Sequence, residues 1–219
     1  MTHALAKTTL RAALVLPALV VLAACGAEDT PEDAAATDQI EVDPAKFGNI
    51  DTSPEAVEAA RQAAVQLVGG TGSMREAPAA REAGGELAQG AVLSQATAGA
   101  GTGANGTDCA AIAQYGDEWA DTLPASFPVY PASQVIEAAG TDESGCSLRV
   151  INFASPVPVK DVMDFYYTRA AGEGFQVQRV SMDGEDTLGG TSSGRNFLVV
   201  GRERPGGGSD IDLIVGGGG

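Results

Sequence analysis

Short runs in which apolar and polar residues alternate fill the last part of the chain. Ile211, Leu213 and Val215, for example, are separated by Asp212 and Ile214. A period of two residues is typical of a β-strand, and such a strand suits a sheet with one face covered by a helix. These runs predict strands over residues 135–140, 146–153, 175–182, 197–202 and 211–215, with a short strand through Thr187 and Leu188.

A helical period interrupts the runs after the second predicted strand. Pro158 suits the start of a helix, and one face of the turns that follow is apolar. The residues on that face are Val159, Val162, Met163, Tyr166 and Ala170. The order of elements is therefore ββαβββ. It predicts an α+β fold, a two-layer sandwich with one amphipathic helix on an antiparallel sheet of four or five strands.

A weaker helical pattern lies near residue 60. Ser53 is a good N-cap, Pro54 suits the first turn, and two glycines follow the last turn. The pattern predicts an isolated amphipathic helix over 53–68, and it leaves open whether this helix docks on the rest of the protein. Residues 25–52 resemble an acidic tether and residues 69–107 a Gly/Ala-rich linker, because neither stretch has enough apolar residues for a core.

Aromatic residues locate the folded domain. The single Trp, all four Tyr and five of the six Phe follow residue 108. Residues 108–219 are therefore expected to form one α+β domain, which is long enough to fold alone. At its start, the spacing of Cys109, Ile112, Gly116 and Trp119 predicts a short helix.

A basic start and a short apolar run occupy the first 24 residues. The apolar run is too short to cross about 30 Å of hydrocarbon as a helix. With small residues after it, this pattern is typical of a secretory signal peptide. The motif Leu22-Ala23-Ala24-Cys25 resembles the lipobox of bacterial lipoprotein precursors. That resemblance implies cleavage before Cys25 and its acylation, for example with palmitate; the alternative is an ordinary signal peptide cut near Ala24.

The lipobox also implies a location. By the sorting rule of that family, Gly26 in place of an aspartate implies delivery to the outer membrane, facing the periplasm. Acyl chains would hold the protein on the membrane. The chain has 13 basic and 29 acidic residues, and cleavage removes two of the basic ones. An acidic surface repels nucleic acid, so no nucleic-acid partner is expected.

Cleavage would also remove His3, the single histidine. Histidine is the commonest general base and metal ligand, so the sequence predicts no catalytic residue, no metal site, no cofactor and no enzymatic activity. Cys109 and Cys146 remain as an even pair of thiols in an oxidising compartment. They predict a disulfide, with two free buried thiols as the alternative. The loop-entropy model gives such a bridge about 3–4 kcal/mol.

Four segments of the predicted domain resemble a further group of proteins. They are residues 123–132, 153–157, 164–167 and 174–175, with the sequences LPASFPVYPA, FASPV, DFYY and GF. They are similar to small uncharacterised bacterial envelope lipoproteins, and the resemblance covers residues 123–215. It implies the fold predicted above and supplies no catalytic residues.

Phe165 and Tyr167 flank the apolar stripe of the predicted helix. They are candidates for an exposed contact patch, and covering the edge of a small core is the alternative. Together, these patterns predict a lipid-anchored envelope lipoprotein that is a non-catalytic binding or structural module and contacts another envelope protein. The alternative function is a small-ligand carrier with a pocket between helix and sheet.

Overall fold

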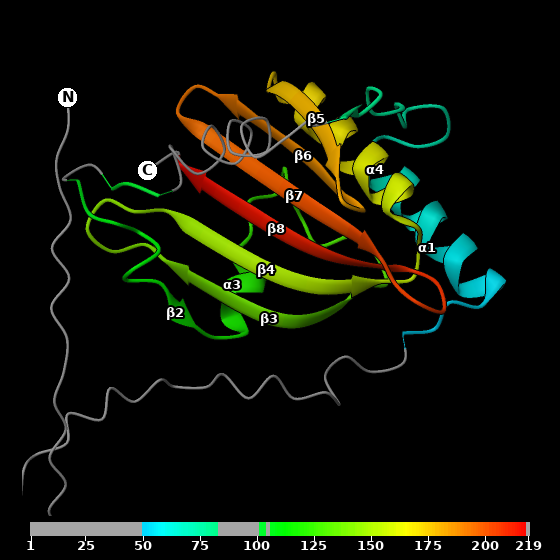
Figure 1. Cartoon of the computed structure of the whole chain (residues 1–219), viewed down its shortest axis with the longest axis horizontal. Coiled ribbons are helices and arrows are strands. Elements are labelled where there is room, and N and C mark those ends of the chain that lie inside the picture. Colours follow the sequence, from blue (N-terminus) through cyan, green and yellow to red (C-terminus); the bar gives the residue numbers. More distant parts are fainter. Residues whose placement is uncertain (1–49, 83–100, 104–105, 218–219) are drawn as a thin grey trace, which may run out of the picture. The chain divides into compact units, whose positions relative to one another are not determined.

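Six strands of seven to nine residues form the centre of the fold (Figure 1). The computed structural model describes residues 50–82, 101–103 and 106–217. The six strands are β3 (Gln134–Thr141), β4 (Leu148–Ser155), β5 (Gln176–Met182), β6 (Glu185–Ser192), β7 (Arg195–Glu203) and β8 (Ser209–Gly217). Two-residue strands, β1 (Arg81–Glu82) and β2 (Gln114–Tyr115), extend the two edges. The sheet order is β1-β5-β6-β7-β8-β4-β3-β2, and only the β1–β5 pair is parallel.

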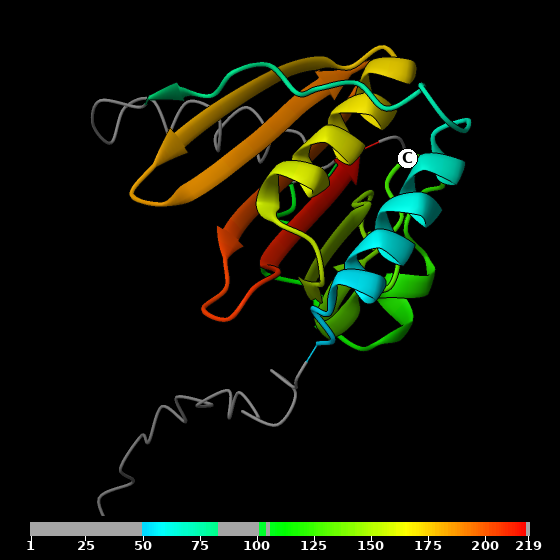
Figure 2. The same ribbon diagram turned by 90° about the vertical axis from the view of Figure 1, so that its right-hand side faces the viewer.

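One face of this sheet is covered by helix α4 (Val159–Gly172), with helix α1 (Pro54–Leu67) on the same side (Figure 2). Alternate strand residues point toward α4 and are buried, as Phe197, Val199 and Leu213 show. The helix comes close to β7 at Gly201. A Cβ atom there would lie 2.7 Å from Val159 and 3.0 Å from Met163, so a larger residue would push the two layers apart.

The core of the domain is strongly aromatic. The rings of Phe127 and Phe197 stack with their centroids 4.7 Å apart, and Phe175 meets Phe127 edge-on at 5.2 Å. Tyr130 and Phe165 form a further edge-on pair at 5.2 Å. These rings are almost completely buried, and they account for much of the apolar surface removed from water.

Helix α1 docks on α4, which answers a question that the sequence left open. Its N-cap is the predicted Ser53, whose Oγ accepts a hydrogen bond from the Ala56 N–H at 3.3 Å. Ala60 and Ala64 are completely buried in the main core. Small side chains on this face let the two helices approach closely. The helix is thus part of the domain's core.

The predicted fold class, four or five antiparallel strands with one helix, is wrong. The sheet has eight strands and is mixed, and the described residues contain three helices. The strand expected through Thr187 and Leu188 is only part of β6, which is longer. The sequence predicts it too short because the glycines of β6 interrupt the alternating pattern. Gly190 fits there because a Cβ atom would lie 2.6 Å from the Gln176 carbonyl oxygen.

The edges of the sheet account for the rest of the difference. β1 and β2 are two residues long, too short for a period of two to be recognised. The helix predicted from Cys109 to Trp119 is also wrong. In its place the chain forms turns, then β2, then the single-turn helix α3 (Glu118–Asp121). Pairing of β2 with β3 overrides the near-helical spacing of the apolar residues.

Candidate functional site

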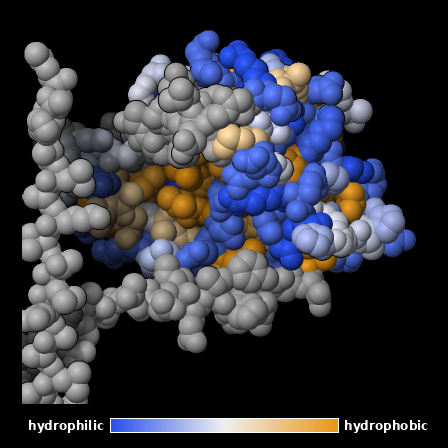
Figure 3. All heavy atoms as spheres, viewed as in Figure 1, coloured by the Kyte–Doolittle hydropathy of each residue, from blue (hydrophilic) through white to orange (hydrophobic). Residues whose placement is uncertain are grey.

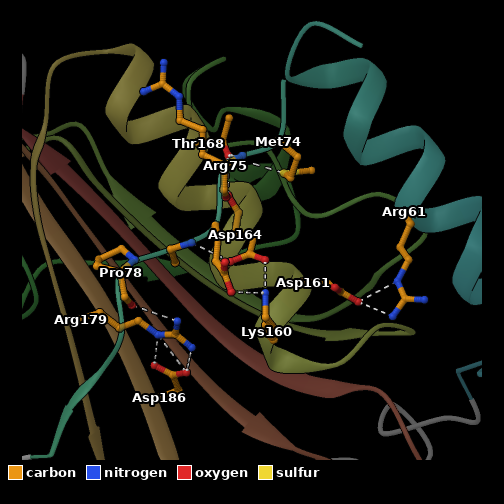
Figure 4. A network of polar contacts seen from close by, with 12 residues as sticks. Arg61, Met74, Arg75, Pro78, Lys160, Asp161, Asp164, Thr168, Arg179 and Asp186 are labelled. Carbon is orange, nitrogen blue, oxygen red and sulfur yellow. Dashed lines mark hydrogen bonds and ion pairs between the residues drawn. The ribbon is translucent and has the colours of Figure 1, made fainter. Parts of the chain in front are cut away.

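The segment 73–82, here called the strap, runs along α4 to reach β1. It belongs to the stretch that the sequence predicts as linker. Asp164 on α4 accepts a hydrogen bond from the Ala77 N–H at 2.8 Å, and Thr168 Oγ1 accepts one from the Arg75 N–H at 2.8 Å. The strap ends where β1 pairs with β5. Two side chains of one helix thus fix the path of the strap (Figure 4).

Ion pairs complete this network. Lys160 Nζ lies 2.8 Å from the Asp164 carboxylate, and this hydrogen bond raises the pKa of Lys160. Arg179 on β5 pairs with Asp186 and donates to the Pro78 carbonyl at 3.2 Å. Asp164 is therefore a mostly buried carboxylate whose oxygens are occupied. Such a group holds structure in place.

Replacement of Asp164 by alanine is expected to loosen the strap. The Ala77 N–H would lose its acceptor in a buried place, which costs about 1–3 kcal/mol. Amide hydrogen exchange should speed up at Ala77 more than at the core strands. Asp161→Ala is the matched control, because it removes a carboxylate from the same helix whose ion pair, with Arg61, is partly exposed. Unchanged exchange at Ala77 would show that Asp164 does not hold the strap.

The opposite face of the sheet carries a hollow of about 280 Å³, here called the sheet groove. Its floor is apolar and its rim at one end is polar. The floor is formed by Ala110, Ala113, Ala139, Leu148 and Val150, and the rim by Glu137, Asn152 and Asp212. Figure 3 shows apolar side chains gathered over β4 and β8. The floor is apolar because β4 carries apolar side chains on both of its faces. Ile151 and Phe153 point toward the main core, and Leu148 and Val150 point to the opposite face.

Tyr115 stands at the side of the sheet groove and is 65% exposed. Among the described residues, Tyr115 and Leu67 are the exposed large apolar side chains, and Tyr115 is the more exposed of the two. At the rim, Asn152 Nδ2 donates to Asp212 at 2.7 Å, and Asp212 pairs with Arg202 at 2.8 Å. Glu137 pairs with none of the described cations. The groove thus combines an exposed aromatic, an apolar floor and one uncompensated carboxylate.

A disulfide fixes one wall of the sheet groove. The bond joins Cys109 and Cys146, with Cα atoms 5.6 Å apart, which is compatible with the predicted pairing. The two cysteines pack with Leu148, Ile112 and Ala113 in a small cluster of their own. The bond therefore holds the segment before β2, and with it Tyr115, against β3 and β4.

The other predicted site residues lie elsewhere. Phe165 is 0% exposed and packs edge-on against Tyr130 and Tyr166, so it contributes nothing to a surface patch. Tyr167 is half-buried against the core. The buried Tyr166 hydroxyl donates to the Pro128 carbonyl at 2.8 Å, and burial raises its pKa. Cys25 lies outside the described residues.

The sequence missed the sheet groove, although it carried a signal for it. Strands with apolar residues at successive positions, such as 150–151 and 213–215, have an apolar second face. Only the sheet order brings β2, β3, β4 and β8 together around one hollow.

Two features are absent from the part of the chain that the structure describes. No group of three or more His, Cys, Asp and Glu side chains in this part of the chain could hold a metal ion. No helix in it is long and apolar enough to cross a membrane. The whole chain matches no protein-family model, no curated protein and no solved structure.

Proposed function

We propose that the protein is a lipid-anchored envelope protein whose domain binds a segment of another envelope protein in the sheet groove, without catalysing a reaction. The observation that carries this proposal is Tyr115, an exposed aromatic beside an apolar hollow. Tyrosine supplies large contact area at a low cost in conformational entropy and is enriched at interaction hot spots.

The chemistry of the groove favours an apolar side chain flanked by a basic one. The floor of alanine, leucine and valine side chains offers an apolar surface of limited depth. At the rim, the Glu137 carboxylate has no cationic partner among the described residues. The chain as a whole is acidic, with a formal net charge of −16. A basic partner segment is therefore favoured electrostatically, mainly in its rate of association.

The position of the domain in the chain supports the same proposal. A lipid anchor at Cys25 would hold the domain near a membrane. Tethering raises the effective concentration of the groove for any partner in the same envelope. At a raised effective concentration, a groove that binds its partner with modest affinity is sufficient for the two proteins to associate.

The carrier alternative places a ligand directly between α4 and the sheet. That space is filled by buried side chains, among them Met163, Phe197 and Leu213, each 0% exposed. Native cores are packed as densely as organic crystals, so a ligand there would have to displace these side chains. The sheet groove is the better-supported site.

Site-specific crosslinking tests the proposed function. A photoreactive phenylalanine analogue in place of Tyr115 should give a discrete adduct in intact cells, and the same analogue at Leu67, the other exposed apolar position, should not. Adding Glu137→Lys should remove the adduct by reversing the rim charge. Tyr115→Ala should weaken binding by about 2 kcal/mol or more if the tyrosine is a hot spot. The same adducts from positions 115 and 67 would contradict a specific groove.

A further inference from the structure

A second hollow, of about 220 Å³, opens on the α4 side of the sheet at the end where β8 finishes. Its apolar wall is formed by Phe127, Phe175 and Val215, which belong to the main core. Its polar lining includes two arginines, Arg149 and Arg195. None of the described residues that line it is an aspartate or a glutamate. In a chain of net charge −16, a hollow with two cations and no carboxylate is unexpected.

We infer that this hollow, here called the arginine pocket, binds a small carboxylate that has an apolar body. The apolar wall would cover the body of the ligand, and the guanidinium of Arg195 would pair with the carboxylate. This site is distinct from the sheet groove and lies on the other face of the sheet, so the inference does not rest on the proposed function.

Arg195 is the residue placed to bind the carboxylate. Its guanidinium lies over the ring of Phe175, with the Cζ atom 5.0 Å from the ring centroid. Stacking of this kind orients the guanidinium while leaving its N–H edges accessible. Its ion pair with Glu173 is long at 3.4 Å, and the side chain is 37% exposed. A ligand carboxylate would replace a weak partner with a bidentate one.

Arg149 has a different part, because its donors are already occupied. It pairs with Asp142 at 2.8 Å, and its Nε donates to Thr122 Oγ1 at 2.7 Å. Its guanidinium also lies over Trp119 at 4.7 Å. Arg149 therefore forms a rigid polar wall. Only Arg195 is left to meet the ligand, so the pocket suits a single carboxylate better than a phosphate dianion.

The volume limits the size of the ligand. A water molecule occupies about 30 Å³ of the liquid, so the pocket holds the equivalent of about seven waters. One aromatic ring or a short branched chain with a carboxylate fills such a space. Benzoate is a suitable probe, with benzamide as its uncharged analogue of nearly the same shape.

Titration of the purified full chain with benzoate, followed by NMR, tests the inference. Benzoate should shift the Val215 methyl signals, and benzamide should bind at least about tenfold more weakly, because a hydrogen bond to a charged group is stronger than one to a neutral group. Arg195→Gln should weaken benzoate binding by at least about tenfold, and Arg195→Lys should weaken it by less, because lysine keeps the charge but lacks the stacked, bidentate fork of the guanidinium. Arg202→Gln, on the other face and similarly exposed, should leave binding unchanged.

Three results would overturn the inference. They are equal binding of benzoate and benzamide, unchanged benzoate binding by Arg195→Gln, and benzoate-induced shifts that avoid Val215 and Phe175. Circular dichroism and the melting temperature of each variant show whether it is folded. If Arg195→Gln proves unfolded, the comparison of benzoate with benzamide on the unmodified chain still decides the matter.

Discussion

Phe165→Ala is expected to lower the free energy of unfolding by about 3–5 kcal/mol. Phe165 is 0% exposed and belongs to the main core. Truncation to alanine leaves a cavity and removes ring contacts with Tyr130 and Tyr166 at 5.2 and 5.1 Å. The surrounding rings come from α4 and from the segment before β3, so they cannot collapse into the space without moving backbone.

Equilibrium unfolding in guanidinium chloride, with the disulfide intact, measures this loss. The midpoint should fall while the slope of free energy against denaturant stays the same. Tyr115→Ala is the matched control, since it removes another aromatic side chain that is 65% exposed; its effect on stability should stay within about 0.5 kcal/mol. A loss below about 1 kcal/mol for Phe165→Ala would mean that this ring is not part of a packed core.

The same residue shows what the sequence could predict and what it could not. The stripe of Val159, Val162, Met163 and Tyr166 correctly predicts helix α4. It does not tell how wide the buried face is. Contacts from α1 on one side and from the segment before β3 on the other extend the buried face to Phe165. Local periodicity indicates one buried side of a helix. Where other segments also cover its flanks, the full set of buried residues can be known only from the tertiary structure.

The strands show a similar division. The alternation in β8 and the apolar run in β4 are strong local signals, and both strands were predicted with ends within about three residues of those observed. The length of β6 was underestimated because glycine has no side chain that would indicate which face of the strand is buried. β1 depends on non-local contacts: the strap that carries it is held by Asp164 and Thr168, about 90 residues further along the chain.

The two candidate sites lay beyond the sequence for a related reason. Tyr115 and Val150 meet in the sheet groove because β3 lies between β2 and β4. Arg195 and Phe127 meet at the arginine pocket because the segment after α3 folds over the end of the sheet. Neither pair has a characteristic spacing along the chain. A site assembled from several elements leaves no motif, whereas the N-cap of α1 is local and can be recognised directly.

Cys25→Ala is expected to move the protein from the membrane fraction to the soluble fraction. According to the lipobox interpretation, Cys25 carries the acyl chains, and stable anchoring depends on more than one chain, each contributing about 0.8 kcal/mol per buried methylene. The overall charge would not compensate for their loss, because the chain has 29 acidic and 13 basic residues and anionic headgroups repel an acidic protein.

Fractionation combined with intact mass distinguishes the possible results. The wild-type protein should be found with membranes, and its N-terminal peptide should begin at Cys25 and carry the mass of acyl chains. The variant should be soluble. Its intact mass distinguishes a chain from which the signal peptide has been cleaved from an uncleaved precursor, which the apolar run of its signal peptide would keep on the membrane. Replacing Cys109 and Cys146 together by alanine is the control, since it removes two cysteines and should leave the protein on the membrane. If the N-terminal peptide of the wild-type protein carries no acyl mass, the lipid anchor is ruled out. An ordinary signal peptide cut near Ala24 is then favoured. The proposal of a tethered domain would then fail, while the sheet groove would remain to be tested in a freely diffusing protein.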